Sequence, residues 1–288
     1  RQRQMCIRDR CSETRVFKKI KFDYVEDIPG GSVIAIDMEG NVHEKRIIKK
    51  KEYPCMFEFV YFAKPDSRIK GRSVHDVRVE IGRKLAREAP VDADVVVPVP
   101  ESGRRYAIGF SRESGIPIDE GIMKDKYERS FIQQTQTERD KIVEEGISFI
   151  RAVLNGKRVV IVDDSIVRGT NMRRLVKGIR EAGAKEVHVR IGCPPLIAPC
   201  YLGIDMRSKR EFIARKRDGS IKDWDEIARE IGADSLAYIS MKSLKEAIGF
   251  DVCTGCINFP DGYPEEMRED ALRLFSRDMG ERRAYEVW

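Results

Sequence analysis

Residues 158–171 decide the fold of this chain, and they read Arg158-Val159-Val160-Ile161-Val162-Asp163-Asp164-Ser165-Ile166-Val167-Arg168-Gly169-Thr170-Asn171. The apolar, β-branched run at the start is typical of a parallel strand that is buried on both faces. Two adjacent carboxylates, a loop of small residues and the beginning of a helix follow. We therefore expect a buried strand, a loop and a helix N-terminus in direct succession.

The loop in this stretch has the composition of a phosphate-binding site. Ser165 and Thr170 offer hydroxyl groups, and the first N–H groups of the helix have no partner within the helix. These N–H groups and the helix dipole favour an anion. Asp163 and Asp164 would repel a phosphate unless they contact hydroxyl groups or a metal ion. A sugar phosphate bound with Mg²⁺ meets both conditions, because Mg²⁺ takes carboxylate and substrate oxygens as ligands. The alternative is a plain strand–turn–helix in which the acidic pair only caps the helix.

The order of strand, acidic pair, hydroxyl and Gly-Thr resembles the phosphoribosyl-pyrophosphate (PRPP) fingerprint of the type I phosphoribosyltransferases. The resemblance implies that the acidic pair lies under the ribose hydroxyls and near Mg²⁺, while the loop holds the 5-phosphate. The substrate-binding residues that it implies here are Asp163, Asp164, Ser165, Ile166, Val167, Arg168, Gly169 and Thr170.

Composition and charge limit the class of protein. A chain of 288 residues with 41% hydrophobic residues can form one large α/β domain or two small ones. The net charge of +6 is modest, and no Lys/Arg block is interleaved with aromatics, so we expect no nucleic-acid partner. No apolar run is long enough for a transmembrane helix, and the N-terminus lacks the apolar core of a secretory signal. We expect a soluble, cytoplasmic protein without membrane contact.

Strands and helices alternate along most of the chain. Helices are predicted over residues 73–89, 104–114 and 171–182, and buried strands over 94–100, 158–162 and 186–192. This β-α-β-α-β order predicts an α/β fold with a central parallel sheet flanked by helices. We also expect strands over 22–25, 32–36 and 57–62, a polar loop entering a helix over 124–140, and two amphipathic helices within 221–247.

Further segments resemble the PRPP-using domain of the amidophosphoribosyltransferases. They are residues 55–67 (CMFEFVYFAKPDS), 98–103 (PVPESG), 130–133 (SFIQ) and 193–206 (CPPLIAPCYLGIDM). That family carries out the first committed step of purine synthesis, in which PRPP, glutamine and water give 5-phosphoribosylamine, glutamate and pyrophosphate. The resemblance covers roughly residues 12–265. It implies PRPP and ammonia as substrates, purine nucleotides as inhibitors, and a homo-oligomer, in this family a tetramer.

The resemblance also divides the chain into regions. The family's N-terminal glutaminase, an Ntn-type domain, releases ammonia, and only its final strands have a counterpart here. We therefore expect a fragment that lacks most of the ammonia source, with neither Cys6 nor Cys11 as its nucleophile. The expected regions are a non-native or disordered arm over 1–10, a β-rich glutaminase remnant over 11–52, the phosphoribosyltransferase domain over 53–265 and a charged helical tail over 266–288.

Two more loops complete the expected PRPP site. The turn after the strand at 94–100 presents backbone N–H groups to the pyrophosphate, and its residues are Pro100, Glu101, Ser102 and Gly103. By the resemblance, Ser102 joins Asp163 and Asp164 around Mg²⁺, although an ordinary turn serine is the alternative. The resemblance also implies a flap that closes over PRPP, carrying the catalytic residues Lys126, Tyr127 and Arg129 and also Gln133. Glu128 departs from the family's smaller residue there, and a solvated charged loop is the alternative.

The seven cysteines do not form a disulfide framework, because an odd number in a cytosolic chain pairs poorly. The C-x-x-C formed by Cys253 and Cys256 fits a redox pair, a zinc half-site or an iron–sulfur half-site. The resemblance implies a [4Fe–4S] cluster on Cys55, Cys200, Cys253 and Cys256. Zinc and four free thiols stay open as alternatives, and Cys193 is expected to be a buried or free thiol.

Two other functions fit parts of this pattern. A base-salvage phosphoribosyltransferase would share the fingerprint but would not need the four cysteines. A non-catalytic PRPP-sensing regulator would keep the fingerprint and add a DNA-binding helix-turn-helix, for which residues 1–50 show no helical pattern. The flap and the cysteines favour an amidophosphoribosyltransferase over these two alternatives.

Overall fold

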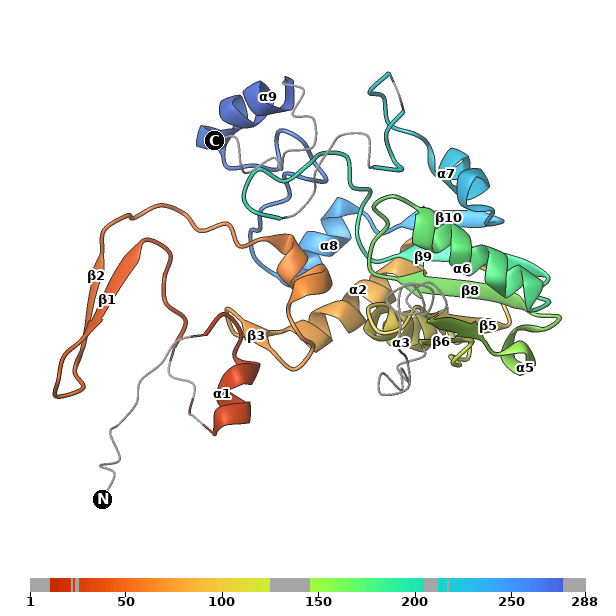
Figure 1. Cartoon of the computed structure of the whole chain (residues 1–288), viewed down its shortest axis with the longest axis horizontal. Helices are drawn as coiled ribbons and strands as arrows, with labels where there is room; N and C mark the ends of the chain where they lie inside the picture. Colours follow the sequence, from red (N-terminus) through yellow and green to blue (C-terminus); the bar gives the residue numbers. More distant parts are fainter. Residues whose placement is uncertain are drawn as a thin grey trace, which may run out of the picture.

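A parallel four-stranded sheet forms the centre of the molecule in the computed structural model, which describes residues 11–21, 23, 26–124, 146–204, 212–216 and 218–276 (Figure 1). The strand order is β10-β9-β8-β5. The strands are β5 (Val95–Pro98), β8 (Arg158–Asp163), β9 (Glu186–Ile191) and β10 (Ser235–Tyr238). Every pair in this sheet is parallel, as the β-α-β-α-β order predicts.

Helices cover both faces of the sheet. The helices α2 (Val74–Glu88), α3 (Arg104–Ser114) and α8 (Met241–Ile248) pack with Val96, Val160 and Val162 in one core. The helices α6 (Thr170–Glu181) and α7 (Trp224–Ile231) pack with alternate strand residues such as Val159 and Ile161 in the other. Figure 1 shows α6 lying along its face of the sheet. Both faces of the sheet are therefore buried, which explains the continuous apolar runs.

Close packing of α2 against α3 depends on two glycines. A Cβ placed at Gly82 would lie 2.0 Å from the carbonyl oxygen of Tyr106, and one at Gly109 would lie 1.9 Å from that of Val79. Any larger residue at either position would push the helices apart. This contact fixes the direction in which α3 leaves the loop at residues 98–103.

The segment at 57–62 is a π-helix, η1 (Glu58–Phe62), so the predicted strand is wrong. Residues 57–62 lack the polar–apolar alternation that is typical of a half-buried strand. Two of its residues, Phe59 and Val60, point into the core, whereas Tyr61 and Phe62 are exposed. Its backbone carbonyls are held by side chains from α2 and α3, a tertiary influence that no local pattern reveals.

The segment at 221–247 contains a strand between its two predicted helices. Its residues Ser235–Tyr238 pair with β9, with Ser235 opposite His188 and Tyr238 opposite Ile191. The strand is four residues long and contains no β-branched residue, so its sequence carries little strand signal. It forms because the edge of β9 is available for pairing.

The N-terminal part consists of a short helix and a hairpin. The helix α1 (Arg15–Ile20) stands where turns and strands were expected, and β1 (Ser32–Ile36) confirms the strand at 32–36. With β2 (Val42–Arg46), β1 forms an antiparallel hairpin that extends away from the body in Figure 1. The expected strand at 22–25 lies mostly outside the described residues.

Smaller elements connect these parts. They are β3 (Arg68–Ile69), β4 (Arg72–Ser73), β6 (Ile122–Lys124), β7 (Ile147–Phe149), α5 (Arg151–Leu154), η3 (Glu265–Met267) and α9 (Arg268–Ser276). The helix α9 packs through Ala271 and Leu274 on Tyr201 and Tyr263. None of the helices in the described ranges has the length and apolar character that crossing a membrane requires.

Candidate functional site

Two loops of the predicted site meet at the carboxyl edge of the sheet. Because β5 and β8 are parallel neighbours, with Pro98 opposite Val162, their following loops emerge side by side. Residues 99–103 follow β5, and residues 164–169 follow β8. Ligands of open α/β sheets bind at this edge. The structure thus brings together the two motifs that lie some sixty residues apart in sequence.

A hydrogen-bond chain connects the loops through the acidic pair. The Ser102 hydroxyl donates to Asp163 Oδ1 at 2.8 Å, and the Asp164 N–H donates to the same oxygen at 2.8 Å. The Ser165 hydroxyl donates to Asp164 Oδ1 at 2.6 Å. Asp164 is 4% exposed, and its Oδ2 is buried with no hydrogen-bond partner among the described residues. That oxygen is available to a hydroxyl group or a cation.

Burial makes this pair reluctant to ionise. It raises the pKa of Asp163 well above its usual range, and the charge of Asp164 raises it further. Burial also raises the pKa of Asp164 to about 6, although the Ser165 hydroxyl and the charge of Arg78 partly oppose this rise. Perturbed carboxyls of this kind gather at functional sites, because a bound cation or donor compensates their charge.

The loop after the acidic pair ends at an uncapped helix N-terminus. Gly169 is the N-cap of α6 with φ of 75°, and no side chain within the described ranges caps the helix there. A Cβ at Gly169 would lie 2.2 Å from Ile213 Cδ1, so glycine is needed for space as well as conformation. Ile166 is buried, whereas Arg168 and Thr170 are exposed. The first N–H groups of α6 are therefore placed for an anion.

The loop at 99–103 lies tightly against β8. The N–H of Val99 donates to Val162 O at 3.0 Å, and a Cβ at Gly103 would lie 2.2 Å from that same oxygen. The peptide bond between Pro100 and Glu101 is cis. The Glu101 carboxylate is exposed and forms ion pairs with Arg104 and Arg105.

The remaining predicted PRPP-site residues lie outside the described residues: Lys126, Tyr127, Arg129 and Gln133.

The four predicted cluster cysteines gather from three segments. Cys55 and Cys253 are paired in a parallel β-bridge, and the N–H of Met56 donates to Cys253 O at 3.3 Å. Burial raises the pKa of Cys55 to about 12, and Cys200 and Cys253 lie near enough to raise it further. Burial raises the pKa of Cys256 strongly, and the same neighbours contribute. All four thiols are free. Across the described ranges, no three His, Cys, Asp or Glu side chains are arranged to hold a metal ion.

Sequence reasoning missed two buried side chains next to the site, Arg78 and Tyr106. Arg78 is 4% exposed and Tyr106 is fully buried. A signal existed for the first, because Arg78 lies four residues after Val74 on the apolar face of a predicted helix. A charge at such a position is expected to have a specific partner.

The parallel sheet, the acidic pair and the uncapped helix together define a phosphoribosyltransferase domain. The family described as phosphoribosyl transferase domain matches residues 75–199. Two curated amidophosphoribosyltransferases are 47% identical to this chain. The protein from Methanothermobacter thermautotrophicus aligns over 92% of this chain and 56% of its own length, and that from Methanocaldococcus jannaschii over 91% and 58%.

Solved structures agree with these relatives. The glutamine PRPP amidotransferase of B. subtilis, complexed with ADP and GMP, is 39% identical with a TM-score of 0.77, covering 92% of this chain and 58% of that one. A structure described as the allosteric regulatory enzyme of purine biosynthesis is 41% identical with a TM-score of 0.78, covering 90% and 56%. By sequence and by fold, this chain is a homologue of the amidophosphoribosyltransferases. It spans little more than half the length of the relatives it matches.

Proposed function

We propose that this chain carries the site at which an amidophosphoribosyltransferase converts PRPP and ammonia into 5-phosphoribosylamine and pyrophosphate. The observation that carries the proposal is the acidic pair of half-buried Asp163 and buried Asp164, connected to Ser102 beside the N-terminus of α6. The similarity of the chain to amidophosphoribosyltransferases also supports the proposal.

Each part of PRPP has a matching group in this arrangement. The N–H groups at the start of α6 and the hydroxyls of Ser165 and Thr170 suit the 5-phosphate. The Asp164 oxygen without a partner suits a ribose hydroxyl. The backbone of residues 100–103 suits the pyrophosphate. The substrate would therefore lie across the carboxyl ends of β5 and β8, with its C1 atom between the two loops.

The proposed reaction breaks the bond between C1 and the pyrophosphate oxygen and forms a bond between C1 and the ammonia nitrogen. Positive charge develops on the sugar, and the added nitrogen loses a proton to solvent. Ammonia needs little activation, so the protein contributes position and charge stabilisation. A carboxylate under the ribose favours this developing positive charge. The flap residues Lys126, Tyr127 and Arg129 are proposed to exclude water from it.

Mg²⁺ fits the residues present. Asp163, Asp164 and Ser102 supply the oxygen donors that would hold the ion. Two carboxylates with substrate phosphates and water are the usual environment of this ion. When bound, Mg²⁺ neutralises charge on the departing pyrophosphate.

We also propose that Cys55, Cys200, Cys253 and Cys256 bind a [4Fe–4S] cluster. The proposal is supported by four free, mutually interacting thiols drawn from three separate segments. Such a cluster would connect the start of the domain to its end. Its proposed role is structural, because the proposed transfer requires no electron. Anaerobically purified Cys253→Ser should lose iron and sulfide, whereas Cys11→Ser, at an exposed free thiol, should keep both. Zinc in place of iron, or no metal in the wild type, would contradict the cluster.

The other partners follow from the same relatives. Ammonia is proposed to come from glutamine in the full-length protein. Purine nucleotides are proposed as inhibitors, since one similar structure is a complex with ADP and GMP. A homotetramer and a cytoplasmic location stay predictions.

The first test is pyrophosphate release from PRPP and Mg²⁺ by anaerobically purified protein. Ammonia and glutamine are supplied in separate assays. We expect release with ammonia and none with glutamine alone. Binding of PRPP without release under any condition would favour a PRPP-binding regulator, and release only with a purine base would favour a salvage enzyme.

A further inference from the structure

The π-helix η1 is held under the candidate site by two buried side chains. Arg78 of α2 donates from Nε to Phe59 O at 2.6 Å and from Nη2 to Ala63 O at 2.8 Å. Tyr106 of α3 donates its hydroxyl to Val60 O at 2.8 Å. Two carbonyls of η1, and that of Ala63 directly after it, thus accept hydrogen bonds from side chains of two other helices. A π-helix is rare and is often found at functional sites.

Tyr106 also contacts the backbone that positions the acidic pair. Its ring packs so closely on Gly192 that a Cβ there would lie 2.4 Å from Tyr106 Cδ1. The Gly192 N–H in turn donates to Asp163 O at 2.9 Å. Tyr106 lies one helical turn after Ser102, whose hydroxyl binds Asp163. The Tyr106 side chain therefore connects η1 to Gly192, and through Gly192 to the end of β8, while its backbone continues from the loop at 99–103.

The other end of η1 leads to the cysteines. Cys55 comes three residues before η1 and is bridged to Cys253. The N–H of Met56 donates to Cys253 O. Displacement of η1 would therefore move the connection between these two cysteine segments. Among the described residues, this is a continuous contact path from the acidic pair to the cysteines.

We propose that Tyr106 is a positioning residue whose hydroxyl couples η1, and through it the Cys55–Cys253 connection, to the PRPP site. Ligand binding at the acidic pair fixes Gly192 and the loop at 99–103, and Tyr106 passes this restraint to Val60. Arg78 holds the carbonyls of Phe59 and Ala63, on either side of Val60, and so fixes both ends of this segment. The inference rests on the proposed binding of PRPP at Asp163 and Asp164.

Hydrogen exchange followed by mass spectrometry on the full chain tests the proposal, with Tyr106→Phe and Tyr238→Phe as a matched pair. Both tyrosines are buried, but the Tyr238 hydroxyl has no hydrogen-bond partner among the described residues. In the wild type, PRPP with Mg²⁺ should slow exchange in residues 56–63. In Tyr106→Phe, exchange there should be about tenfold faster without ligand, the effect of one lost buried hydrogen bond. PRPP should then no longer slow it.

Protection of residues 163–170 by PRPP should persist in Tyr106→Phe, since the variant keeps the ring against Gly192. Tyr238→Phe should match the wild type throughout. Wild-type exchange and wild-type protection of residues 56–63 in Tyr106→Phe would overturn the proposal. If that variant does not fold, Arg78→Lys, which keeps the charge but cannot reach both carbonyls, must show faster exchange in the same segment. If PRPP slows exchange of residues 163–170 in neither the wild type nor the variants, the proposed function fails. Exchange of residues 56–63 without PRPP, compared between the wild type and Tyr106→Phe, still shows whether the Tyr106 hydroxyl holds η1.

Discussion

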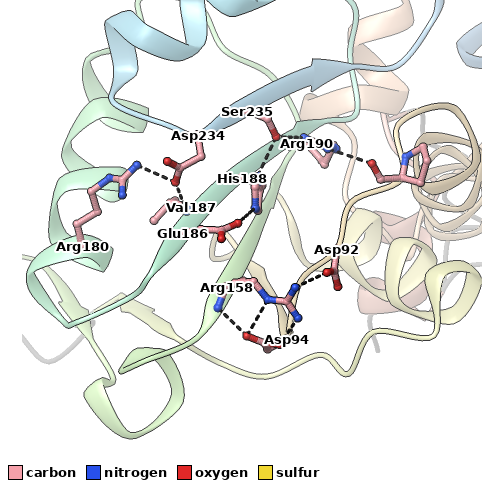
Figure 2. Close-up of polar contacts among 11 residues, drawn as sticks. Asp92, Asp94, Arg158, Arg180, Glu186, Val187, His188, Arg190, Asp234 and Ser235 are labelled. Atoms are coloured by element: carbon pink, nitrogen blue, oxygen red, sulfur yellow. Dashed lines mark hydrogen bonds and ion pairs between the residues drawn. The ribbon is translucent and has the colours of Figure 1, made fainter.

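The carboxyl groups at the two ends of strand β8 have opposite electrostatic environments. At its amino end, Arg158 binds Asp94 through Nη2 at 2.7 Å and also pairs with Asp92 (Figure 2). These bonds lower the pKa of Asp94 to about 2. At its carboxyl end, burial raises the pKa of Asp163 well above its usual range. The same strand thus begins beside a carboxylate, Asp94, whose charge Arg158 compensates, and ends with a carboxyl group, Asp163, that has no such cation among the described residues.

The neighbouring strands repeat the pattern at the amino edge. In Figure 2, Asp234 pairs with Arg180 at 2.8 Å, and Glu186 contacts His188 at 3.1 Å. Arg190 contacts no carboxylate of the described residues and instead donates to carbonyls just after α2, including Ala89 O at 2.8 Å. Paired charges at this edge serve the fold. Unpaired carboxyls at the other edge lower stability unless a ligand compensates them, which is the expected signature of a binding site.

The largest expected effect is on activity. Asp163→Asn combined with Asp164→Asn removes the two carboxyl groups that we propose to lie under the ribose and to bind Mg²⁺. We expect the rate of ammonia-dependent pyrophosphate release to fall by about 10³-fold or more, since electrostatic groups of this kind contribute that much. Asp92→Asn combined with Asp94→Asn is the matched control, with the same chemistry at the other end of the sheet, and should stay within about twofold. Equal losses in both double variants would remove the distinction between the two edges.

The second effect concerns stability and has the opposite sign. The ligand-free double variant at Asp163 and Asp164 no longer has to ionise two buried carboxyls. Its free energy of unfolding at neutral pH should therefore exceed that of the wild type, by on the order of 1–2 kcal/mol. Urea unfolding monitored by circular dichroism measures the difference. A destabilised but folded variant would show that the pair contributes to the fold, like the acids of the amino edge.

Sequence alone could predict the loops at the carboxyl edge of the sheet, but not the ion pairs of the amino edge or the tertiary contacts of Tyr106. The run at 158–171 contains the strand, the acidic pair and the start of the helix, so its local sequence was enough to predict this part of the site. The amino edge gave no such signal, because Arg158 and Asp94 meet only when β5 and β8 pair. Tyr106 and Val60 are likewise brought together only by tertiary packing. The segment at 57–62 was misread for the same reason, since its π-helix is held by contacts outside it.

The smallest expected effect is a difference in pH dependence between the edges. The folded-state pKa of Asp164, about 6, is above its unfolded value near 3.8, so the folded protein binds more protons between these values. Its contribution to stability is therefore lost as the pH rises from about 4 to 6. The pKa of Asp94 is depressed to about 2, so its contribution is present above about pH 4 and is lost as the pH falls toward 2.

Thermal unfolding of the ligand-free protein between about pH 3 and 7 separates the two contributions. Relative to the wild type, the Asp163→Asn/Asp164→Asn variant should gain most at the upper end of this range. Asp94→Asn should lose stability above about pH 4 and converge with the wild type at lower pH. The second change should be small and weakened by salt, because the Arg158 pair is solvent-exposed. If the melting temperatures of all three proteins depended on pH in the same way, the carboxyl groups of the two edges would not differ in the folded state. The proposed difference between the two ends of β8 would then be wrong.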